Sequence, residues 1–350
     1  MANNSGFDPN GVGIANGNIF GFPVAEQEAD LVIIPVPWDA TASYGKGTSE
    51  GPQIILDAST QLDFYHPQLP EAWNTKVFMT PISEEMKRIN DELCVDAVSY
   101  IDFLEQGGTL TEDSSFQEVV QRINATSEAL RKSLKERASA LLKEGKIVAV
   151  LGGEHSTPFG LIEALNDLGQ PFGILQIDAH ADLRDAYEGF QESHASIMHN
   201  VVHHCDNLEK LVQVGIRDVA ASEVQLSNTH SKITTFFDWE IKRRQFEGEN
   251  WKSIVDSIIR ELPQRVYISF DIDGLHPSLC PHTGTPVAGG FELEQIAYLF
   301  FQVIEAGKEI VGFDLNEVAP GPSGDWDANV GARALWNLVC ATEKSRRLTR

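Results

Sequence analysis

Short apolar runs recur along the chain and alternate with helical patterns, and this alternation restricts the possible folds more than any other feature. The runs are rich in β-branched residues and are four to six residues long; they occupy residues 31–34, 147–151, 172–177, 211–216, 266–270 and 310–315. Near-continuous apolar runs of this length suit strands that are buried on both faces of a parallel sheet. The sequence therefore predicts a mostly parallel sheet.

Helical periodicity fills the segments between these runs. The clearest pattern extends from about Phe116 to Leu142, and Gly145 beyond it is a suitable C-terminal cap. Further helices are expected over residues 50–62, 157–168, 251–261 and 292–306. Strands that alternate with helices predict an α/β fold with three layers, in which helices cover both faces of the sheet.

The length of 350 residues allows either one large α/β domain or two smaller ones. Residues 1–28 are rich in Gly and Asn and lack periodicity, so we expect an irregular N-terminal arm there. No linker or internal repeat interrupts the remainder. We therefore expect a single catalytic domain over residues 29–345.

Composition excludes several classes of protein. The formal net charge of −24 leaves no Lys/Arg stripe to neutralise phosphates, which argues against nucleic acid as a partner. No apolar stretch approaches the roughly 20 residues that cross a bilayer, and the N-terminus lacks the features of a signal peptide. The four cysteines are far apart and suit a reduced protein. We expect a cytoplasmic protein without membrane partners.

Polar motifs directly follow four of the apolar runs. His155 follows the run 147–151, Asp178 follows 172–177, Asp271 follows 266–270, and Glu317 follows 310–315. In an open α/β sheet, ligands bind outside the carboxyl ends of the strands. Four separate segments are therefore expected to meet at one edge of the sheet.

Carboxylates gather at this edge, and in a folded protein they do so only where a cation offsets their repulsion. In Asp178-Ala-His180-Ala-Asp182 and Asp271-Ile-Asp273 the polar residues alternate, which places them on one side of an extended backbone. The competing interpretation is a set of independent loop-capping residues. The combined motifs favour a site for two divalent metals, and hence a metal-activated hydrolase.

The donor set is rich in oxygen, includes two imidazoles and contains no thiolate. Such a set suits Mn²⁺, with Ni²⁺, Co²⁺, Fe²⁺ and Zn²⁺ as alternatives.

The motifs together resemble those of the ureohydrolase family, which includes arginases, agmatinases and formimidoylglutamases. The resemblance extends from about Pro35 to Arg333, and it rests on the segments GGEHS (152–156), DAHADLR (178–184), SFDIDGLHP (269–277) and NEVAP (316–320). It implies an arginase-like single domain, a binuclear manganese site, and hydrolysis of a guanidino or formimino group.

The resemblance also implies the roles of individual residues. A metal-bound hydroxide would attack the planar guanidinium carbon, and Asp182 would orient that hydroxide. One metal would be held by His155, Asp178, Asp182 and Asp271, and the other by Asp178, His180, Asp271 and Asp273.

Two further residues receive catalytic roles. Glu317 would anchor the cationic guanidinium through charge-assisted hydrogen bonds. His194 lies in a YEG…SHA pattern similar to that of some bacterial agmatinases, and its pKa near neutrality would let it protonate the leaving amine. His199, His203 and His204 have helical spacing and are expected to be surface or core residues.

Three residues bear on substrate choice. Arg184 replaces a short polar residue of arginases; it would bind a substrate carboxylate, or it would pair with Asp185, Glu188 or Glu192. Trp38 would line the mouth of the pocket or pack in the interior. His276 stands where the family usually has Asp, a residue that would support the metal loop.

The leading hypothesis is an agmatinase-like enzyme that converts agmatine and water to putrescine and urea. The nearest alternative is a formimidoylglutamase or guanidino-acid hydrolase of the same family. A deacetylase-type amide hydrolase and a non-catalytic metal-binding protein are the more distant alternatives. The family commonly forms homo-oligomers, so a trimer or hexamer is expected.

Overall fold

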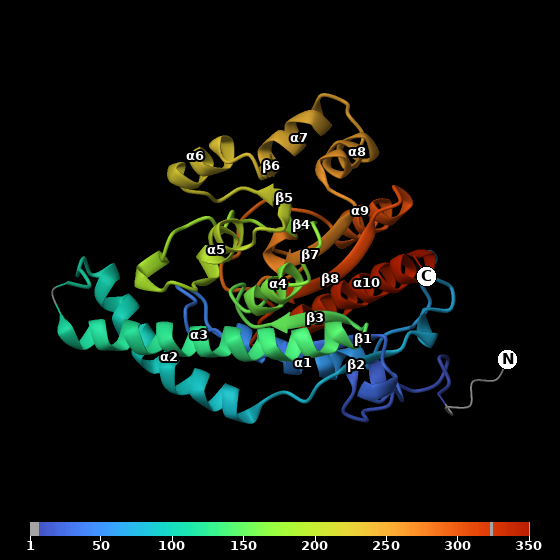
Figure 1. Ribbon diagram of the computed structural model, residues 1–350, viewed down its shortest axis with the longest axis horizontal. Coiled ribbons are helices and arrows are strands. Elements are labelled where there is room, and N and C mark those ends of the chain that lie inside the picture. Colours follow the sequence, from blue (N-terminus) through green and yellow to red (C-terminus); the bar gives the residue numbers. More distant parts are fainter. Residues whose placement is uncertain (1–6, 112, 323–324, 350) are drawn as a thin grey trace.

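A computed structural model describes residues 7–111, 113–322 and 325–349, and over these residues all strands join one parallel sheet (Figure 1). The strand order is β2-β1-β3-β8-β7-β4-β5-β6. The strands are β1 (Leu31–Val36), β2 (Val77–Met79), β3 (Ile147–Gly152), β4 (Phe172–Ile177), β5 (Leu208–Ile216), β6 (Ile233–Phe237), β7 (Arg265–Asp271) and β8 (Glu309–Asn316). The predicted α/β fold with a parallel sheet is confirmed.

Helices cover both faces of this sheet (Figure 1). Along β1, Ile33 belongs to one apolar core whereas Val32 and Ile34 belong to the other, so the strand is buried on both sides. This double burial explains why the strand segments read as continuous apolar runs. The first core lies under α1 (Gly51–Ser59), α8 (Trp251–Glu261), α9 (Leu293–Glu305) and α10 (Trp326–Thr349); the second lies under α2 (Glu84–Glu105), α3 (Ser114–Lys143), α4 (Phe159–Asn166) and α5 (Ile197–His204).

The remaining helices, α6 (Ala221–Thr229) and α7 (Asp238–Phe246), contact the edge strand β6. Each of the five predicted helices is present, and α8 has the predicted bounds. Periodicity did not identify α10, because most of its residues between 327 and 345 are buried and only a narrow polar stripe, Asn329, Arg333 and Asn337, marks its solvent side. The sequence analysis also did not assign α2, α6, α7, β2 and β6, whereas the helical spacing of His199, His203 and His204 indicated α5.

The register of the central strands aligns the ends of the motif-bearing runs. Strands β3, β8, β7 and β4 are direct neighbours. Leu151 pairs with Leu315, Leu315 with Phe270, and Phe270 with Ile177. The four apolar runs therefore end side by side, and the polar residues that follow them share one edge.

Part of the predicted N-terminal arm belongs to the hydrophobic interior, while its residues 1–6 lie outside the described residues. The Asn18 side chain accepts hydrogen bonds from the backbone N–H groups of Ile19 and Met79, both at 2.9 Å. Phe22 is 1% exposed, and its ring centroid lies 5.1 Å from that of Phe64. The placement of a domain boundary at residue 28 stays a prediction.

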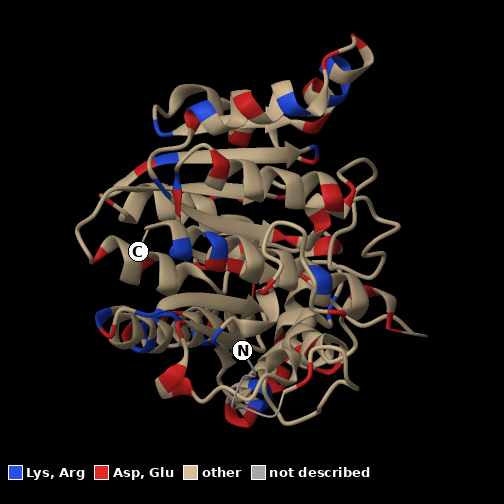
Figure 2. Cartoon of the chain, turned by 90° about the vertical axis from the view of Figure 1, so that its right-hand side faces the viewer, with Lys and Arg blue, Asp and Glu red and all other residues tan. Residues whose placement is uncertain are grey.

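Figure 2 shows Lys and Arg scattered among Asp and Glu over the helices and loops that face the viewer. Among the described helices, none combines the length and the apolar character that a bilayer crossing requires.

The packing of the N-terminal segment can be tested with Phe22→Ala. We expect this change to lower the free energy of unfolding by about 3–5 kcal/mol, because it leaves a cavity among buried aromatic rings. The matched control is Val12→Ala at a side chain that is 92% exposed, with an expected change within about 0.5 kcal/mol. Denaturant unfolding of both variants measures the difference. Equal stability of the two variants would contradict the proposed packing.

Candidate metal centre and active site

Close backbone packing directs the segment after β3 into the site. A Cβ atom on Gly153 would lie 1.9 Å from the carbonyl oxygen of Trp38, so only glycine fits there. The next residue, Glu154, donates its backbone N–H to the same carbonyl at 2.8 Å. This contact fixes the turn that brings His155 over the ends of the neighbouring strands.

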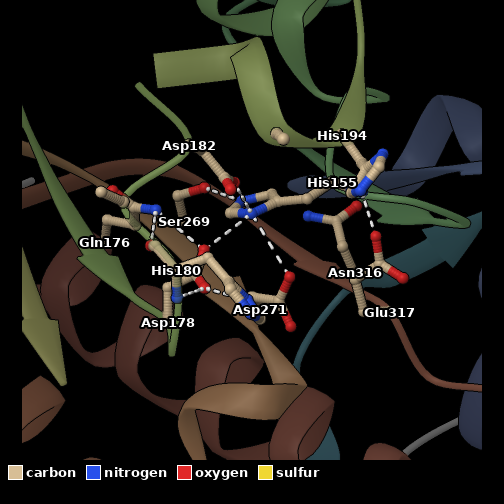
Figure 3. A network of polar contacts seen from close by, with 12 residues as sticks. His155, Gln176, Asp178, His180, Asp182, His194, Ser269, Asp271, Asn316 and Glu317 are labelled. Atoms are coloured by element: carbon tan, nitrogen blue, oxygen red, sulfur yellow. Dashed lines mark hydrogen bonds and ion pairs between the residues drawn. The ribbon is translucent and has the colours of Figure 1, made fainter. Parts of the chain in front are cut away.

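His155 lies at the centre of the acidic residues (Figure 3). Its Nδ1 atom is 3.0 Å from Asp178 Oδ2, 2.9 Å from Asp182 Oδ2 and 3.4 Å from Asp271 Oδ2. All four residues are buried. Neither His155 Nδ1 nor Asp182 Oδ2 has a hydrogen-bond partner within the described part of the chain. Nitrogen and oxygen atoms that converge in this way without hydrogen-bond partners are suited to bind a cation.

The other ring nitrogen of His155 is held by a buried chain of two residues. Ser269 Oγ donates to Asp314 Oδ1 at 3.0 Å and lies 2.9 Å from His155 Nε2. Because the serine proton points to Asp314, its oxygen accepts the N–H of His155 Nε2. Once the ring loses its second proton, Nδ1 presents a free lone pair, as a metal ligand must.

A second group of ligand atoms adjoins the first and shares Asp178 with it. His180 Nδ1 lies 2.9 Å from Asp273 Oδ2 and 3.7 Å from Asp178 Oδ1. Two sets of ligand atoms are each close enough to hold one ion: His155 with Asp178 and Asp271, and Asp178 with His180 and Asp273. The structure thus brings together all six residues predicted as ligands.

The raised pKa values of the buried aspartates indicate that the cluster needs positive charge nearby. Burial raises the pKa of Asp182 to about 7, and the charge of Asp178 acts in the same direction. Burial and the charges of Asp273 and Asp178 raise the pKa of Asp271. Without a cation these carboxylates would take up protons, whereas divalent ions would keep them charged. The residues present therefore fit two divalent metals.

A cavity of about 170 Å³ opens over the cluster, and Glu317 forms part of its wall. One oxygen of the Glu317 carboxylate accepts the backbone N–H of His155 at 2.8 Å. Burial and the charge of Glu154 raise the pKa of Glu317, and a cation in the cavity would oppose this effect. Glu317 and Asp182 have φ angles of 65° and 53°, in a left-handed region that is costly for residues other than glycine.

His194 also lines the cavity. Its ring Nε2 lies 3.2 Å from Ser43 Oγ, and its backbone N–H donates to Thr41 Oγ1 at 3.1 Å. Thr41 Oγ1 in turn donates to the buried Glu154 carboxylate at 2.6 Å. Burial, together with the charges of His180 and Lys46, lowers the pKa of His194 to about 3. The surroundings of His194 therefore hold this imidazole neutral, in contrast to the near-neutral pKa expected from the sequence.

The residues singled out for substrate choice lie in three different environments. Arg184 lines the cavity, its guanidinium carbon lies 4.6 Å from the Tyr187 ring centroid, and its Nε lies 3.7 Å from Glu223 Oε2. Trp38 is 1% exposed in the hydrophobic interior and does not line the cavity, which favours the packing alternative. His276 is exposed, and its side chain contacts Ser278 instead of the acidic cluster.

Sequence reasoning missed the residues that support the ligands. Glu223 pairs with Arg184 in place of the three acids considered, and the Arg217 guanidinium donates to the carbonyl of Asp273 at 2.6 Å. Ser269 and Asp314 are polar residues inside otherwise apolar strand runs. A polar residue inside an apolar run could have been recognised in the sequence as a supporting residue, because a buried polar side chain needs a hydrogen-bond partner. The α5 histidines behave as expected for surface or core residues: His203 and His204 are exposed, and His199 is half-buried.

Comparison with known proteins agrees with this geometry. The chain is 31% identical over 309 residues to an N(1)-aminopropylagmatine ureohydrolase of Thermus thermophilus, covering 88% of each chain. Its fold is similar to that of an agmatine ureohydrolase of Thermoplasma volcanium, with a TM-score of 0.72, 23% identity, and coverage of 95% of this chain and 97% of the other. A Trypanosoma cruzi formiminoglutamase with Mn²⁺ matches with a TM-score of 0.69, 15% identity, and coverage of 93% and 97%.

The sequence model of the arginase family matches residues 29–341 of this chain, which is nearly the whole folded region. The chain belongs to the arginase family.

Proposed function

We propose that this protein is a ureohydrolase that releases urea from a cationic guanidino substrate of the agmatine type. The observation that carries the proposal is the charge of the cavity. Besides Asp182 and Asp271, which would hold the ions, its wall includes three carboxylates, Asp218, Glu223 and Glu317, against a single arginine, Arg184, which is paired with Glu223. A substrate with a guanidinium at one end and an amine at the other complements such a wall.

The roles of the residues follow from their positions. Two divalent ions, most suitably Mn²⁺, would be held by His155, Asp178, His180, Asp182, Asp271 and Asp273, and would supply an activated water at neutral pH. Glu317 would accept hydrogen bonds from the substrate guanidinium and hold its carbon in place for attack. Asp182, which also lines the cavity, would orient the attacking water.

His194 delivers a proton to the departing amine. Its ring is oriented by Ser43, and its backbone is held by Thr41. Because the free imidazole is neutral, it would accept a proton from the attacking water during the reaction and transfer that proton to the departing amine.

One observation favours a second candidate function. The Arg184 side chain is 41% exposed at the cavity, so a substrate carboxylate can reach it. A formiminoglutamate or guanidino-acid hydrolase would use Arg184 in this way. The stacking on Tyr187 and the pairing with Glu223 instead satisfy much of its charge within the protein, and this favours the agmatine-type substrate.

The proposal includes a cytoplasmic location, supported by the four free cysteines, of which Cys205, Cys280 and Cys340 are buried. We also propose that the protein forms a homo-oligomer, either a trimer or a hexamer, because members of the family commonly do so.

Metal binding is expected to stabilise the protein. Mn²⁺ at about 100 times its dissociation constant should add about 2.7 kcal/mol per site to the free energy of unfolding. Asp271→Asn should lose most of this gain, because it removes the charge of one ligand. Asp63→Asn is the control, since Asp63 is exposed and outside the cluster. Thermal unfolding with Mn²⁺ or chelator measures the gain, and an Asp271→Asn variant with the full gain would contradict the site.

The stabilisation by metal is expected to rise with pH. Burial opposes protonation of His155 and His180, but the facing carboxylates raise both pKa values well above the ordinary 6.5. In the metal-free protein, the ion pairs between these histidines and the carboxylates contribute fully to the stability of the fold below pH 6.5. That contribution is lost as the pH rises through the raised pKa values. Metal must displace the same protons, so the Mn²⁺-dependent shift in melting temperature should grow from about pH 6 to about pH 8. A constant shift would argue against histidine ligation.

Substrate choice can be tested with agmatine, N(1)-aminopropylagmatine, arginine, formiminoglutamate and guanidinobutyrate in the presence of Mn²⁺. We expect urea from agmatine or its aminopropyl derivative, and we expect Arg184→Ala to keep most of that activity. Activity confined to the carboxylate-bearing substrates and lost in Arg184→Ala would overturn the agmatine-type proposal in favour of the second candidate.

The role of His194 can be tested with His194→Asn. Loss of proton delivery should lower kcat by about 10²–10⁴-fold, with metal content unchanged because His194 belongs to neither ligand group. His203→Asn, an exposed residue of α5, is the matched control and should retain wild-type kcat. Steady-state kinetics and metal analysis distinguish the two. A His194→Asn variant with wild-type kcat would exclude this role.

A further inference from the structure

Two glutamines lie inside the parallel sheet, where the strand pattern is otherwise apolar. Gln176 on β4 and Gln213 on β5 are both fully buried and are paired in register. Burial of an amide side chain is costly unless its polar atoms are hydrogen-bonded. The positions of their partners therefore indicate what these residues do.

The two amides form a continuous chain of hydrogen bonds with Thr235 on β6, which we call the amide relay. Thr235 Oγ1 donates to Gln213 Oε1 at 2.8 Å, and Gln213 Nε2 donates to Gln176 Oε1 at 2.7 Å. Gln176 Nε2 then donates to Asp178 Oδ2 at 2.8 Å, as Figure 3 shows. The relay thus connects the edge strand to a carboxylate shared by both ligand groups.

The amide relay also holds the backbone of the loop that follows β4. Gln213 Nε2 donates to the carbonyl of Ala181 at 2.7 Å, and Gln176 Nε2 lies 3.3 Å from the carbonyl oxygen of His180. This loop contains Asp182 at a φ of 53°, a left-handed conformation that is unfavourable for a residue with a side chain. The strained loop stays in place only if its surroundings fix it.

We propose that Gln176 and Gln213 are positioning residues that set the metal affinity of the site. The inference rests on the proposed metal-dependent function and adds residues that touch no ion. Gln213 contacts a ligand residue only through Gln176 and through the backbone of the loop. With one carboxylate oxygen and two carbonyls of the loop fixed in advance, the ligands need little reorganisation when the ions bind.

The first test is the Mn²⁺ affinity of the Gln213→Met variant, measured by calorimetric titration of the chelator-treated protein. Methionine keeps the length of the side chain but removes the donors to Gln176 and Ala181. We expect Mn²⁺ to bind about 10–100-fold more weakly, as is typical when a residue supporting a metal ligand is lost. A folded Gln213→Met protein with wild-type affinity would overturn the proposal.

A milder pair of variants serves if Gln213→Met does not fold. Thr235→Val removes the hydroxyl that holds Gln213, whereas Thr234→Val, its neighbour on β6, removes a hydroxyl whose partner is Glu261 on α8. We expect Thr235→Val to weaken Mn²⁺ binding and Thr234→Val to leave it unchanged. Equal affinities for the two variants would contradict the relay, because a general loss of sheet stability would then account for any change.

The titration does not use a substrate, so it separates the relay from the proposed reaction. If the wild-type protein binds Mn²⁺ with the expected variant effects but releases no urea, the ureohydrolase proposal fails and the relay stands. If urea is released and Gln213→Met binds Mn²⁺ as tightly as the wild type, only the relay fails.

Discussion

Repulsion among buried carboxylates is the constraint on which the rest of the structure depends. Three strands deliver acidic side chains to one edge of the sheet and a fourth delivers His155, and burial there raises the pKa of Asp182 and Asp271. Such a cluster is stable in charged form only beside cations. Two divalent ions and the proposed guanidinium substrate would supply that positive charge, so metal binding and substrate recognition would depend on the same electrostatic requirement.

The supporting groups make this arrangement specific. His155 is the clearest example, because Ser269 and Asp314 fix the proton on one ring nitrogen while the other faces three carboxylates. The amide relay acts in the same way on the loop after β4. These groups lie inside the sheet, so the rigidity of the fold is transmitted directly to the ligands.

Much of the site was accessible from the sequence, because each ligand directly follows an apolar run or sits in a motif with alternating polar residues. His155, Asp178 and Asp271 were placed at strand ends, and the register brings them together. Contacts between distant segments were not accessible. The pairing of Arg184 with Glu223 joins the loop after β4 to helix α6, and Trp38 is buried in a core built from segments far apart in the chain.

Hydrophobic period and motif position are local properties, so the layered α/β fold, the edge of the sheet that carries the polar motifs and the residue types suited to metal binding could all be predicted from the sequence. The folded structure was needed to show which carboxylates share a site, how His194 is held neutral, and how Gln213 reaches the loop after β4. These features depend on distances between segments far apart in the chain, and such distances are fixed only when strand order and register are known.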